Sequence, residues 1–578
     1  MIFTKILLKV FFIALVLIPN FLTSEALGTE HFKEFQSLSD MSQSVDMIFS
    51  EFNKPQNPGA NVAVVRGDKY LHAKGYGRMS IEYDLPWTLE SRSRLYSASK
   101  HFVGVACLLL EDQGKLTLED DIRKYLPEMP QYAQKITLRH LLSNTSGIRD
   151  DEGTLNMFGF NATYPISLEY IYDNVITRMK KLNFSPGSAC LYSNSGFRLI
   201  AMIIERVSGK SFPEWMEQNI FKPLEMNNTL VAQYDYEVAE NMASGYDWTE
   251  EGRFKKARLR VGTSGDGGIV STIPDMLKWF NNFRSNRLGI HKFPARLVDK
   301  TKLGDGRISH YGLGINTIDY RGIRALHHGG GADGYQFQFY RFPEQDLTVI
   351  VFANRTDVHI RPMVQKVVNV YLSADLQERE GEKKNYSSVD SKKHEKLKGL
   401  YVNADKGLVV DVSIPEKWAN ADLYMGGAVG IRMRAIEDFE FESVSGYSSE
   451  VARFDFIEGK ERPNLLLNIG LGGDTLFSPV DEIKLSEKEL EKFTGTFKCD
   501  EISEPIQIIV KNQKLVMKLG RGVLSLQWKT LKPVLPYVFY TNYRSMRFFA
   551  DKDGNISGML LNGTHSRFFE FTKVEGIF

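Results

Sequence analysis

The chain has 578 residues, 43% of them hydrophobic and 25% charged, a composition typical of a globular protein that is too long for one compact core. Its 72 Lys and Arg residues balance 71 Asp and Glu residues, so the net charge gives no argument for binding nucleic acid or an anionic membrane. Three scattered cysteines (Cys107, Cys190 and Cys499) form neither a disulfide framework nor a metal-binding spacing, so we expect free thiols and no metal. We also expect no cofactor.

The N-terminus has the pattern of an export signal. Lys5 and Lys9 precede an apolar run over residues 10–18, and the small residues Ala26 and Gly28 offer a cleavage site. The run is shorter than the roughly 20 residues that span a bilayer. We therefore expect a signal peptide over residues 1–28, a secreted or periplasmic protein, and no stable membrane anchor after cleavage.

Residues 40–375 alternate helical and strand patterns, which predicts one α+β domain with an antiparallel sheet. Alternating apolar residues around turn residues predict a hairpin over residues 61–73 and a second over residues 335–352. Between them, apolar residues at helical spacing predict a helix from Ser97 to about Asp112, closed by Gly114, and a further helix over residues 197–207.

The rest of the chain changes character after residue 375. Residues 376–396 are dense in Lys, Glu and Ser, which predicts a linker. Short strand-like runs separated by turns follow, and residues 397–401 weakly resemble residues 493–497. We expect two small all-β barrel or sandwich domains, over residues 397–482 and 485–576.

A candidate nucleophile lies in the run Ser97-Ala98-Ser99-Lys100. Residues three apart share a helix face, so the Ser97 hydroxyl and the Lys100 amine can approach each other. The positive field of a helix N-terminus, together with burial, disfavours an ammonium and leaves Lys100 able to accept the serine proton. From this run alone, a helix-capping Ser97 and a solvated Lys100 are the better interpretation.

Two later motifs favour the catalytic interpretation. Pro186 and Gly187 mark a loop that presents Tyr192 and Asn194 before a predicted helix; Tyr192 can transfer a proton, and Asn194 can orient Lys100 or a substrate carbonyl. By itself, Tyr192 is typical of a packed aromatic residue.

The second motif is His327-His328-Gly329-Gly330-Gly331, which leads into the second hairpin. Its glycines permit close approach of the backbone, and a strand edge there can donate an N–H to an oxyanion or pair with an extended substrate. The two histidines could ligate a metal, but strand alternation points their rings to opposite faces.

These three runs, in this order, resemble the serine β-lactamase and penicillin-binding-protein superfamily. They are most similar to its class C-like branch, with esterase, D-alanyl carboxypeptidase and D-aminopeptidase relatives. Supporting runs that match the same branch are residues 114–120, 141–147 and 267–272. The resemblance covers residues 40–375 and implies a β-lactamase-like serine hydrolase domain there.

The resemblance implies that Ser97 is the nucleophile and Lys100 its base. Tyr192 would relay protons and Asn194 would assist, and whether Lys100 or Tyr192 is the main base stays open. The expected reaction is attack, formation of an acyl-enzyme ester on Ser97, and hydrolysis by water.

The strand motif departs from the β-lactamase pattern. His328-Gly329-Gly330 stands in the place of Lys-Thr-Gly, and the implied oxyanion hole is the backbone N–H groups of Ser97 and Gly331. At neutral pH the motif supplies neither the permanent cation nor the hydroxyl that binds the drug carboxylate, so we do not expect strong β-lactamase activity. Asn144 stands where the family often has His, and we assign it no function.

The sequence therefore predicts a secreted serine acyl hydrolase that acts on an amide or ester, D-aminopeptidase-like or esterase-like. Its expected partner is a small molecule, a short peptide or ester, or a peptidoglycan fragment, and not nucleic acid. The alternatives are a peptidoglycan D-alanyl carboxypeptidase and a non-catalytic binder of cell-wall fragments or β-lactams. The intact set of Ser97, Lys100, Tyr192 and His328 argues against the binder.

Overall fold

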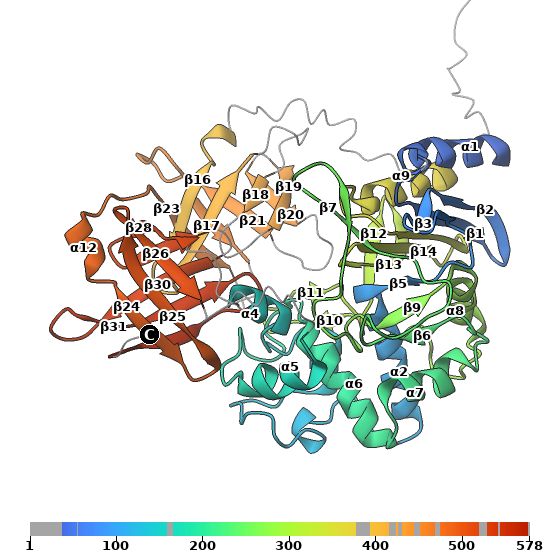
Figure 1. Cartoon of the computed structure of the whole chain (residues 1–578), viewed down its shortest axis with the longest axis horizontal. Coiled ribbons are helices and arrows are strands. Elements are labelled where there is room, and N and C mark those ends of the chain that lie inside the picture. The colour runs from blue at the N-terminus through green and yellow to red at the C-terminus, as the bar shows by residue number, and fades with distance from the viewer. Residues whose placement is uncertain are drawn as a thin grey trace, which may run out of the picture. The chain divides into compact units, whose positions relative to one another are not determined.

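The computed structural model describes residues 37–54, 56–158, 166–376, 394–414, 423–425, 431–437, 439–443, 451–468, 474–519, 529–541 and 544–575 (Figure 1). The predicted signal peptide over residues 1–28 and most of the predicted linker lie outside these residues. Leu38–Phe578 forms one unit.

A six-stranded antiparallel sheet is the centre of the first part of the chain, in the order β12-β13-β14-β15-β1-β2. Its strands are β1 (Ala60–Arg66), β2 (Lys69–Tyr76), β12 (Asn316–Tyr320), β13 (Ile323–Ala332), β14 (Tyr335–Phe342) and β15 (Leu347–Ala353). Both predicted hairpins, β1–β2 and β14–β15, are confirmed. The sheet is completed by pairing its first and last hairpins, because Ala60 of β1 lies opposite Ala353 of β15.

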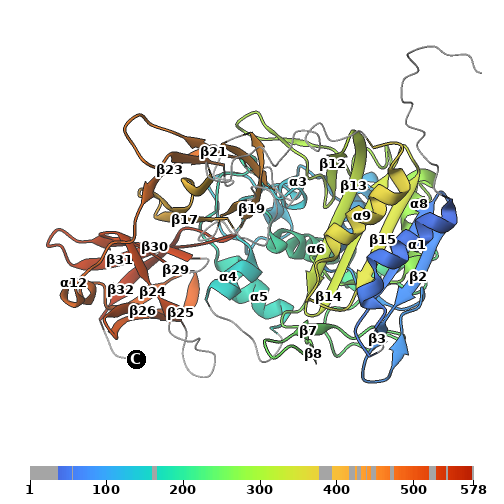
Figure 2. The same cartoon turned by 90° about the horizontal axis from the view of Figure 1, so that it is seen from above.

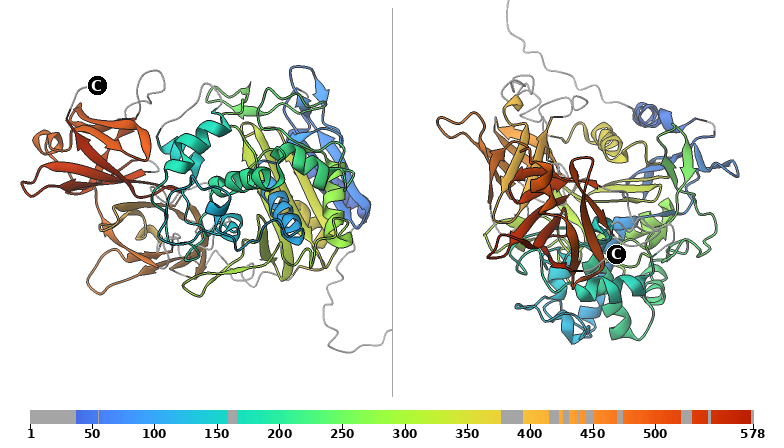
Figure 3. Two further views of the ribbon diagram at one scale, coloured as in Figure 1. Left: turned by 90° about the horizontal axis from the view of Figure 1, so that it is seen from below. Right: turned by 60° about the vertical axis from the view of Figure 1, so that its left-hand side comes forward.

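Helices cover both faces of this sheet, as Figures 2 and 3 show from opposite sides. On one face, α1 (Leu38–Ile48) and α9 (Ile360–Leu372) pack against Val62 and Val64 of β1. On the other face, α2 (Lys100–Asp112) and α8 (Ile273–Ser285) share a core with Ala63 and Val65. Successive side chains of a strand point to opposite faces, so residues 60–65 of β1 are buried on both faces and, apart from Asn61, are apolar.

The segment that follows β2 reaches α2 through a tight turn. A 3₁₀ turn, η2 (Tyr96–Ser99), precedes α2, so the α-helix begins at Lys100 and not at Ser97 as predicted. Tyr96 has φ +45°, a left-handed conformation that bends the chain directly before Ser97. Gly114, with φ +68°, follows the end of α2 as predicted.

The remaining helices of the first part lie mostly between α2 and α8 in the chain. They are α3 (Leu138–Leu142), α4 (Asp151–Met157), α5 (Leu168–Asn174), α6 (Asn194–Ser208) and α7 (Phe212–Met216), with short turns η1 (Ser50–Phe52), η3 (Ile122–Lys124), η4 (Ile176–Arg178) and the π-turn η5 (Glu217–Phe221). The short strands are β3 (Arg78–Ser80), β4 (Leu85–Pro86), β5 (Ser93–Arg94), β6 (Leu230–Val231), β7 (Tyr246–Trp248), β8 (Phe254–Lys256), β9 (Ile269–Ser271), β10 (Thr301–Lys302) and β11 (Ile308–Ser309). The helix predicted over residues 197–207 is α6, which begins three residues earlier.

Among the described residues from 399 onward, the C-terminal part consists of strands and turns apart from α12 (Glu487–Glu491). A closed barrel contains β16 (Gly399–Asn403), β17 (Leu408–Ser413), β18 (Leu423–Met425), β19 (Ile431–Glu437), β20 (Glu440–Ser443), β21 (Val451–Asp455), β22 (Asn464–Leu467) and β23 (Thr475–Val480). A nine-stranded sheet, called here the C-terminal sheet, contains β24 (Gly495–Cys499), β25 (Ile502–Lys511), β26 (Lys514–Leu519), β27 (Lys529–Thr530), β28 (Lys532–Leu535), β29 (Val538–Thr541), β30 (Arg544–Ala550), β31 (Ile556–Gly563) and β32 (Phe569–Val574).

The predicted α+β domain followed by all-β structure is thus confirmed, whereas the exact domain bounds stay a prediction because contacts group Leu38–Phe578 together. All three cysteines are free thiols; Cys107 and Cys499 are buried and Cys190 is half-buried. Within the described part of the chain, no helix combines the length and apolarity needed to cross a bilayer.

Candidate active site

Ser97 lines a cleft where η2 meets strand β13. A Cβ atom placed on Gly330 would come within 2.0 Å of the Leu95 carbonyl oxygen and 2.7 Å of the Ser97 nitrogen. Only glycine therefore allows β13 to lie against the turn that carries Ser97. Strand β12 pairs with β13 only as far as His327, and Gly331 lines the cleft together with Ser97. This geometry places the predicted oxyanion residues on the same cleft.

Lys100 is fully buried, one helical turn after Ser97. Its Nζ donates to Asn194 Oδ1 at 2.8 Å and to the Asp266 carbonyl oxygen at 2.7 Å, and lies 4.7 Å from the centre of the Tyr192 ring. Burial lowers the pKa of Lys100 to about 8, although the negative charge of nearby Asp266 opposes this shift. The structure thus brings Lys100, Tyr192 and Asn194 together beside the first turn of α2.

The loop that carries Tyr192 and Asn194 is held from two sides. Asn144 adopts a left-handed conformation with φ +57°, and its Oδ1 accepts a hydrogen bond from the Ser193 N–H at 3.1 Å. Asp150 Oδ1 accepts from the Asn194 N–H at 2.6 Å, at the start of α6. Asn144, to which the sequence assigned no function, therefore anchors the loop.

His328 does not face the cleft. Its ring is fully buried, with Nδ1 2.6 Å from the Gly329 carbonyl oxygen and Nε2 3.0 Å from the Tyr311 hydroxyl. A carbonyl only accepts, so Nδ1 carries the proton and Nε2 accepts from Tyr311. Burial lowers the pKa of His328 to about 3, so the ring is neutral. His327 stacks on Tyr340 on the other face of the sheet, which confirms that the two rings point apart.

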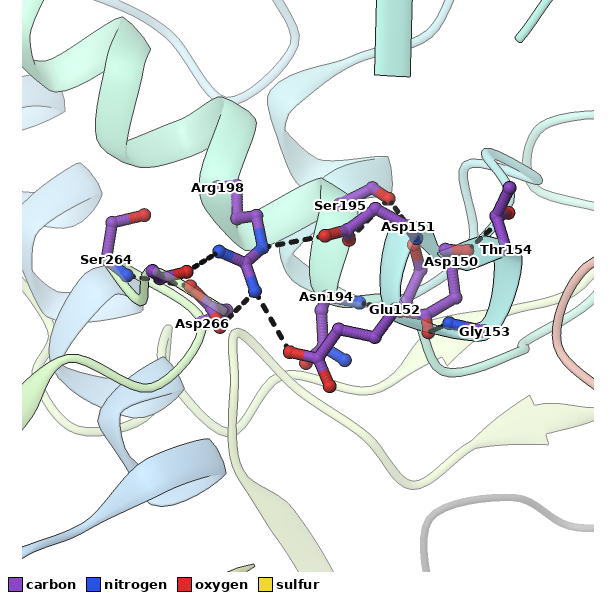
Figure 4. A network of polar contacts seen from close by, with 12 residues as sticks. Asp150, Asp151, Glu152, Gly153, Thr154, Asn194, Ser195, Arg198, Ser264 and Asp266 are labelled. Carbon is purple, nitrogen blue, oxygen red and sulfur yellow. Dashed lines mark hydrogen bonds and ion pairs between the residues drawn. The ribbon is translucent and has the colours of Figure 1, made fainter. Parts of the chain in front are cut away.

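A charge network around Arg198 includes Asp266, whose carbonyl oxygen accepts from Lys100 (Figure 4). Arg198 of α6 forms ion pairs with Asp151 at 2.9 Å, Glu152 at 2.9 Å and Asp266 at 3.0 Å. Burial raises the pKa of Asp150 to about 6 and that of Glu152 to about 8. Sequence reasoning missed this network; its local signals are three consecutive acidic residues and an Asp directly before the Gly267-Gly268 pair.

The cleft itself has a volume of about 80 Å³, room for about five to eight water-sized atoms. Its charged lining residues are Glu152, Asp266, Asp333 and Arg260. Arg260 Nε is paired with Asp333 at 2.9 Å, and Arg198 is paired with both Glu152 and Asp266, so every carboxylate of the lining has a cationic partner. Among the described residues, no group of three or more His, Cys, Asp and Glu side chains is arranged to hold a metal ion.

The chemistry that this arrangement supports is nucleophilic catalysis. The Ser97 hydroxyl lies at the end of a strained turn, one helical turn before the buried Lys100 amine. This amine donates to two oxygens and lies beneath the Tyr192 ring. Such a set can remove a proton from the nucleophile and return one to a leaving group.

The family model described as Beta-lactamase matches residues 45–364, more than half of the chain. A D-aminopeptidase of Gluconobacter oxydans (strain 621H) is 28% identical over 302 residues, 51% of this chain and 56% of that protein. A penicillin-binding protein of Bacillus subtilis (strain 168) is 28% identical over 374 residues, 61% of this chain and 81% of that protein. The chain thus spans little more than half the length of the D-aminopeptidase.

Solved structures give the same fold. The octameric penicillin-binding protein homologue from Pyrococcus abyssi aligns with a TM-score of 0.50 and 21% identity, over 77% of this chain and 100% of that chain. D-amino acid amidase from Ochrobactrum anthropi SV3, complexed with L-phenylalanine amide, aligns with a TM-score of 0.50 and 22% identity, over 58% of this chain and 99% of that chain. At these identities the likeness shows the fold alone.

Proposed function

Because the chain belongs to the beta-lactamase family of serine hydrolases, as its motifs predict, we propose that it is an exported hydrolase of small aminoacyl amides and esters. The observation that carries the proposal is the fully buried Lys100, one helical turn from Ser97 and hydrogen-bonded to Asn194. A lysine whose pKa is lowered to about 8 is neutral often enough at neutral pH to accept the serine proton.

The proposed reaction begins when Ser97 Oγ bonds to the substrate carbonyl carbon and Lys100 Nζ takes the hydroxyl proton. The carbonyl oxygen becomes an oxyanion, which the backbone N–H groups of Ser97 and Gly331 stabilise. The bond to the leaving amine or alcohol breaks as Lys100 or Tyr192 gives that group a proton. Water then attacks the carbonyl carbon of the ester on Ser97 and loses its proton to the same base. The base passes that proton to Ser97 Oγ as the ester bond breaks, which releases the acid and the free Ser97 hydroxyl.

The carboxylates that line the cleft support an aminoacyl substrate. Asp266 and Asp333 are the carboxylates of the lining that can bind the ammonium group of an amino acid, which would share them with Arg198 and Arg260. The volume of the cleft suits a small amino-acid residue. The D-aminopeptidase relative supports D stereochemistry in that residue.

D-alanyl carboxypeptidase action is the second candidate, since the penicillin-binding protein relative is covered over 81% of its length. Its substrate ends in a carboxylate, for which Arg260 is the cation that lines the cleft. To bind such a substrate, Arg260 would have to break its ion pair with Asp333 or contact Asp333 and the substrate carboxylate at the same time.

A substrate panel tests both candidates. Wild type, Ser97→Ala and the exposed control Ser285→Ala are assayed with D-alanine p-nitroanilide, p-nitrophenyl acetate and an acyl-D-Ala-D-Ala peptide. We expect the anilide to be cleaved by wild type and the control but not by Ser97→Ala, with an acyl group on Ser97 detected by mass spectrometry. Preferred cleavage of the peptide supports the carboxypeptidase. Failure of a fluorophosphonate probe to label wild type supports the non-catalytic binder.

A further inference from the structure

Helix α4 lies between the cleft and the C-terminal sheet. Its residues Glu152, Leu155 and Asn156 line the cleft beside Ser97, whereas Met157 belongs to the hydrophobic core of the C-terminal sheet. A helix this short is not stable by itself, so its position depends on what packs against it. The contacts on the side of α4 away from the cleft therefore determine the position of this helix, which forms one wall of the cleft.

The C-terminal end of α4 is held by Arg544 of β30. Its guanidinium donates to the carbonyl oxygens of Asn156 at 2.9 Å and Met157 at 3.1 Å. The last carbonyls of a helix have no partner within the helix and carry a partial negative charge, which a cation complements. Arg544 thus fixes the end of α4 that carries the cleft residue Asn156.

The N-terminal end of α4 is held by the turn between β31 and β32. Ser566 Oγ of this turn donates to the Asp150 carbonyl oxygen at 2.8 Å and accepts from Thr154 Oγ1 at 3.0 Å. Asn183 donates to the His565 carbonyl oxygen at 2.9 Å and accepts from the Arg567 N–H at 3.0 Å. The turn is therefore hydrogen-bonded on both sides.

A buried ion pair reinforces the same end. Arg149, which precedes Asp150 and is fully buried, pairs with Glu501 in the turn between β24 and β25 of the C-terminal sheet. Its guanidinium also donates to the Arg567 carbonyl oxygen at 2.7 Å and lies 4.0 Å from the centre of the Phe569 ring. The Arg149–Glu501 pair holds this contact because both charges are desolvated. Separating them would leave each one buried without a counter-charge.

From this end a chain of hydrogen bonds leads to the proposed base. The carboxylate of Asp150 accepts from the Asn194 N–H, and Asn194 accepts from Lys100 Nζ. We propose that the C-terminal sheet is a working part of the catalytic site: Arg544 sets the cleft wall, and Ser566 orients Asn194 toward Lys100 through Asp150. Arg544 and Ser566 are positioning residues, and the inference rests on the proposed function.

The wall is tested with Arg544→Ala in the full chain, assayed with D-alanine p-nitroanilide. We expect KM to rise about tenfold, equivalent to ~1.4 kcal/mol, with kcat changed by less than about twofold. Arg547→Ala is the matched control, since Arg547 lies on the same strand but donates to Asp405 of the barrel region. Arg544→Lys should restore part of the loss, because an ammonium can reach one carbonyl but lacks the fork of the guanidinium. A KM for Arg544→Ala equal to that of the control overturns this half of the inference.

The orientation of Asn194 is tested with Ser566→Ala, which removes one hydrogen bond and no charge. We expect kcat to fall about fivefold, the equivalent of one hydrogen bond, while KM stays within about twofold. The control is Ser557→Ala, an exposed serine of the adjoining strand β31. Unchanged kcat in Ser566→Ala, at an unfolding temperature equal to that of the control, overturns this half.

Labelling of Ser97 by a fluorophosphonate separates failure of this inference from failure of the proposed function. Absence of labelling in wild type overturns both. Labelled wild type with Arg544→Ala and Ser566→Ala kinetically identical to their controls overturns the inference alone.

Discussion

Raising the pH from 6 to 9 should increase the rate at which Ser97 is acylated by about a hundredfold. Burial lowers the pKa of Lys100 to about 8, and only the neutral amine accepts the serine proton. With that pKa, about 1% of the amines are neutral at pH 6 and about 90% at pH 9. An ordinary lysine would be less than about 5% neutral at pH 9, so its rate would still be rising.

The assay is the burst of p-nitrophenol from an activated ester, followed in a stopped-flow instrument from pH 5.5 to 10. Ser97→Ala supplies the blank for hydrolysis without the enzyme nucleophile. We expect a tenfold rise per pH unit below about pH 7 and a plateau above pH 9. Lys100→Arg should slow the burst at least about a hundredfold at every pH, because a guanidinium does not give up its proton.

Two results would refute the reasoning. A burst rate that climbs without a plateau through pH 10 means that the titrating base does not have a pKa lowered to about 8. A burst of wild-type rate in Lys100→Arg means that its amine is not needed. Tyr192→Phe then decides between the two bases: loss of the burst in Tyr192→Phe, with Lys100→Arg active, assigns the role to Tyr192.

Three further predictions concern the surroundings of this pair. Gly330→Ala should abolish acylation with the circular dichroism spectrum retained, because the new methyl group would lie 2.0 Å from the Leu95 carbonyl oxygen; wild-type labelling would contradict the close approach. Arg198→Met should cost about 3–5 kcal/mol in urea unfolding at pH 8 and less at pH 5, where the raised pKa values of Glu152 and Asp150 allow protonation; a loss below about 1 kcal/mol would count against the network. The pKa of His328 is about 3 in the folded chain and ordinary in the unfolded chain, so the unfolded chain binds more protons between pH 3 and 6.5 and the free energy of unfolding rises with pH across that window. His328→Asn should remove about 3 kcal/mol of this rise between pH 4 and 7, measured by urea midpoints. An unaltered rise would exclude His328 as its source.

The sequence predicted those parts of the fold that local patterns determine. Both hairpins of the large sheet were predicted because alternation and turn residues lie within a few positions of each other. The start of α2 was placed three residues too early, because the 3₁₀ turn at Ser97 depends on contact with Gly330, far along the chain. Local propensity contains no information about that contact.

In the candidate site, too, local motifs could be found from the sequence, whereas contacts between distant residues could not. The spacing of Ser97 and Lys100, and the Tyr192–Asn194 loop, could be found as motifs, and the structure places them together. The ion pairs of Arg198 with Asp151 and Asp266 could not be found, because each acidic residue alone is typical of a solvated surface. The anchoring role of Asn144 also depends on a distant partner. Export, the domain bounds and the catalytic roles stay predictions.

The pairing of β1 with β15 has a consequence for how the protein acquires its structure. Ala60 emerges early in synthesis, yet its partner Ala353 follows only after the helices that cover one face of the sheet. Closing so long a loop is entropically costly, so the sheet forms late and slowly. Until then β1, apolar on both faces, remains exposed and can pair with other chains. On the face that α1 and α9 cover, α9 follows β15 in the chain, so this cover of β1 is incomplete until β15 is in place.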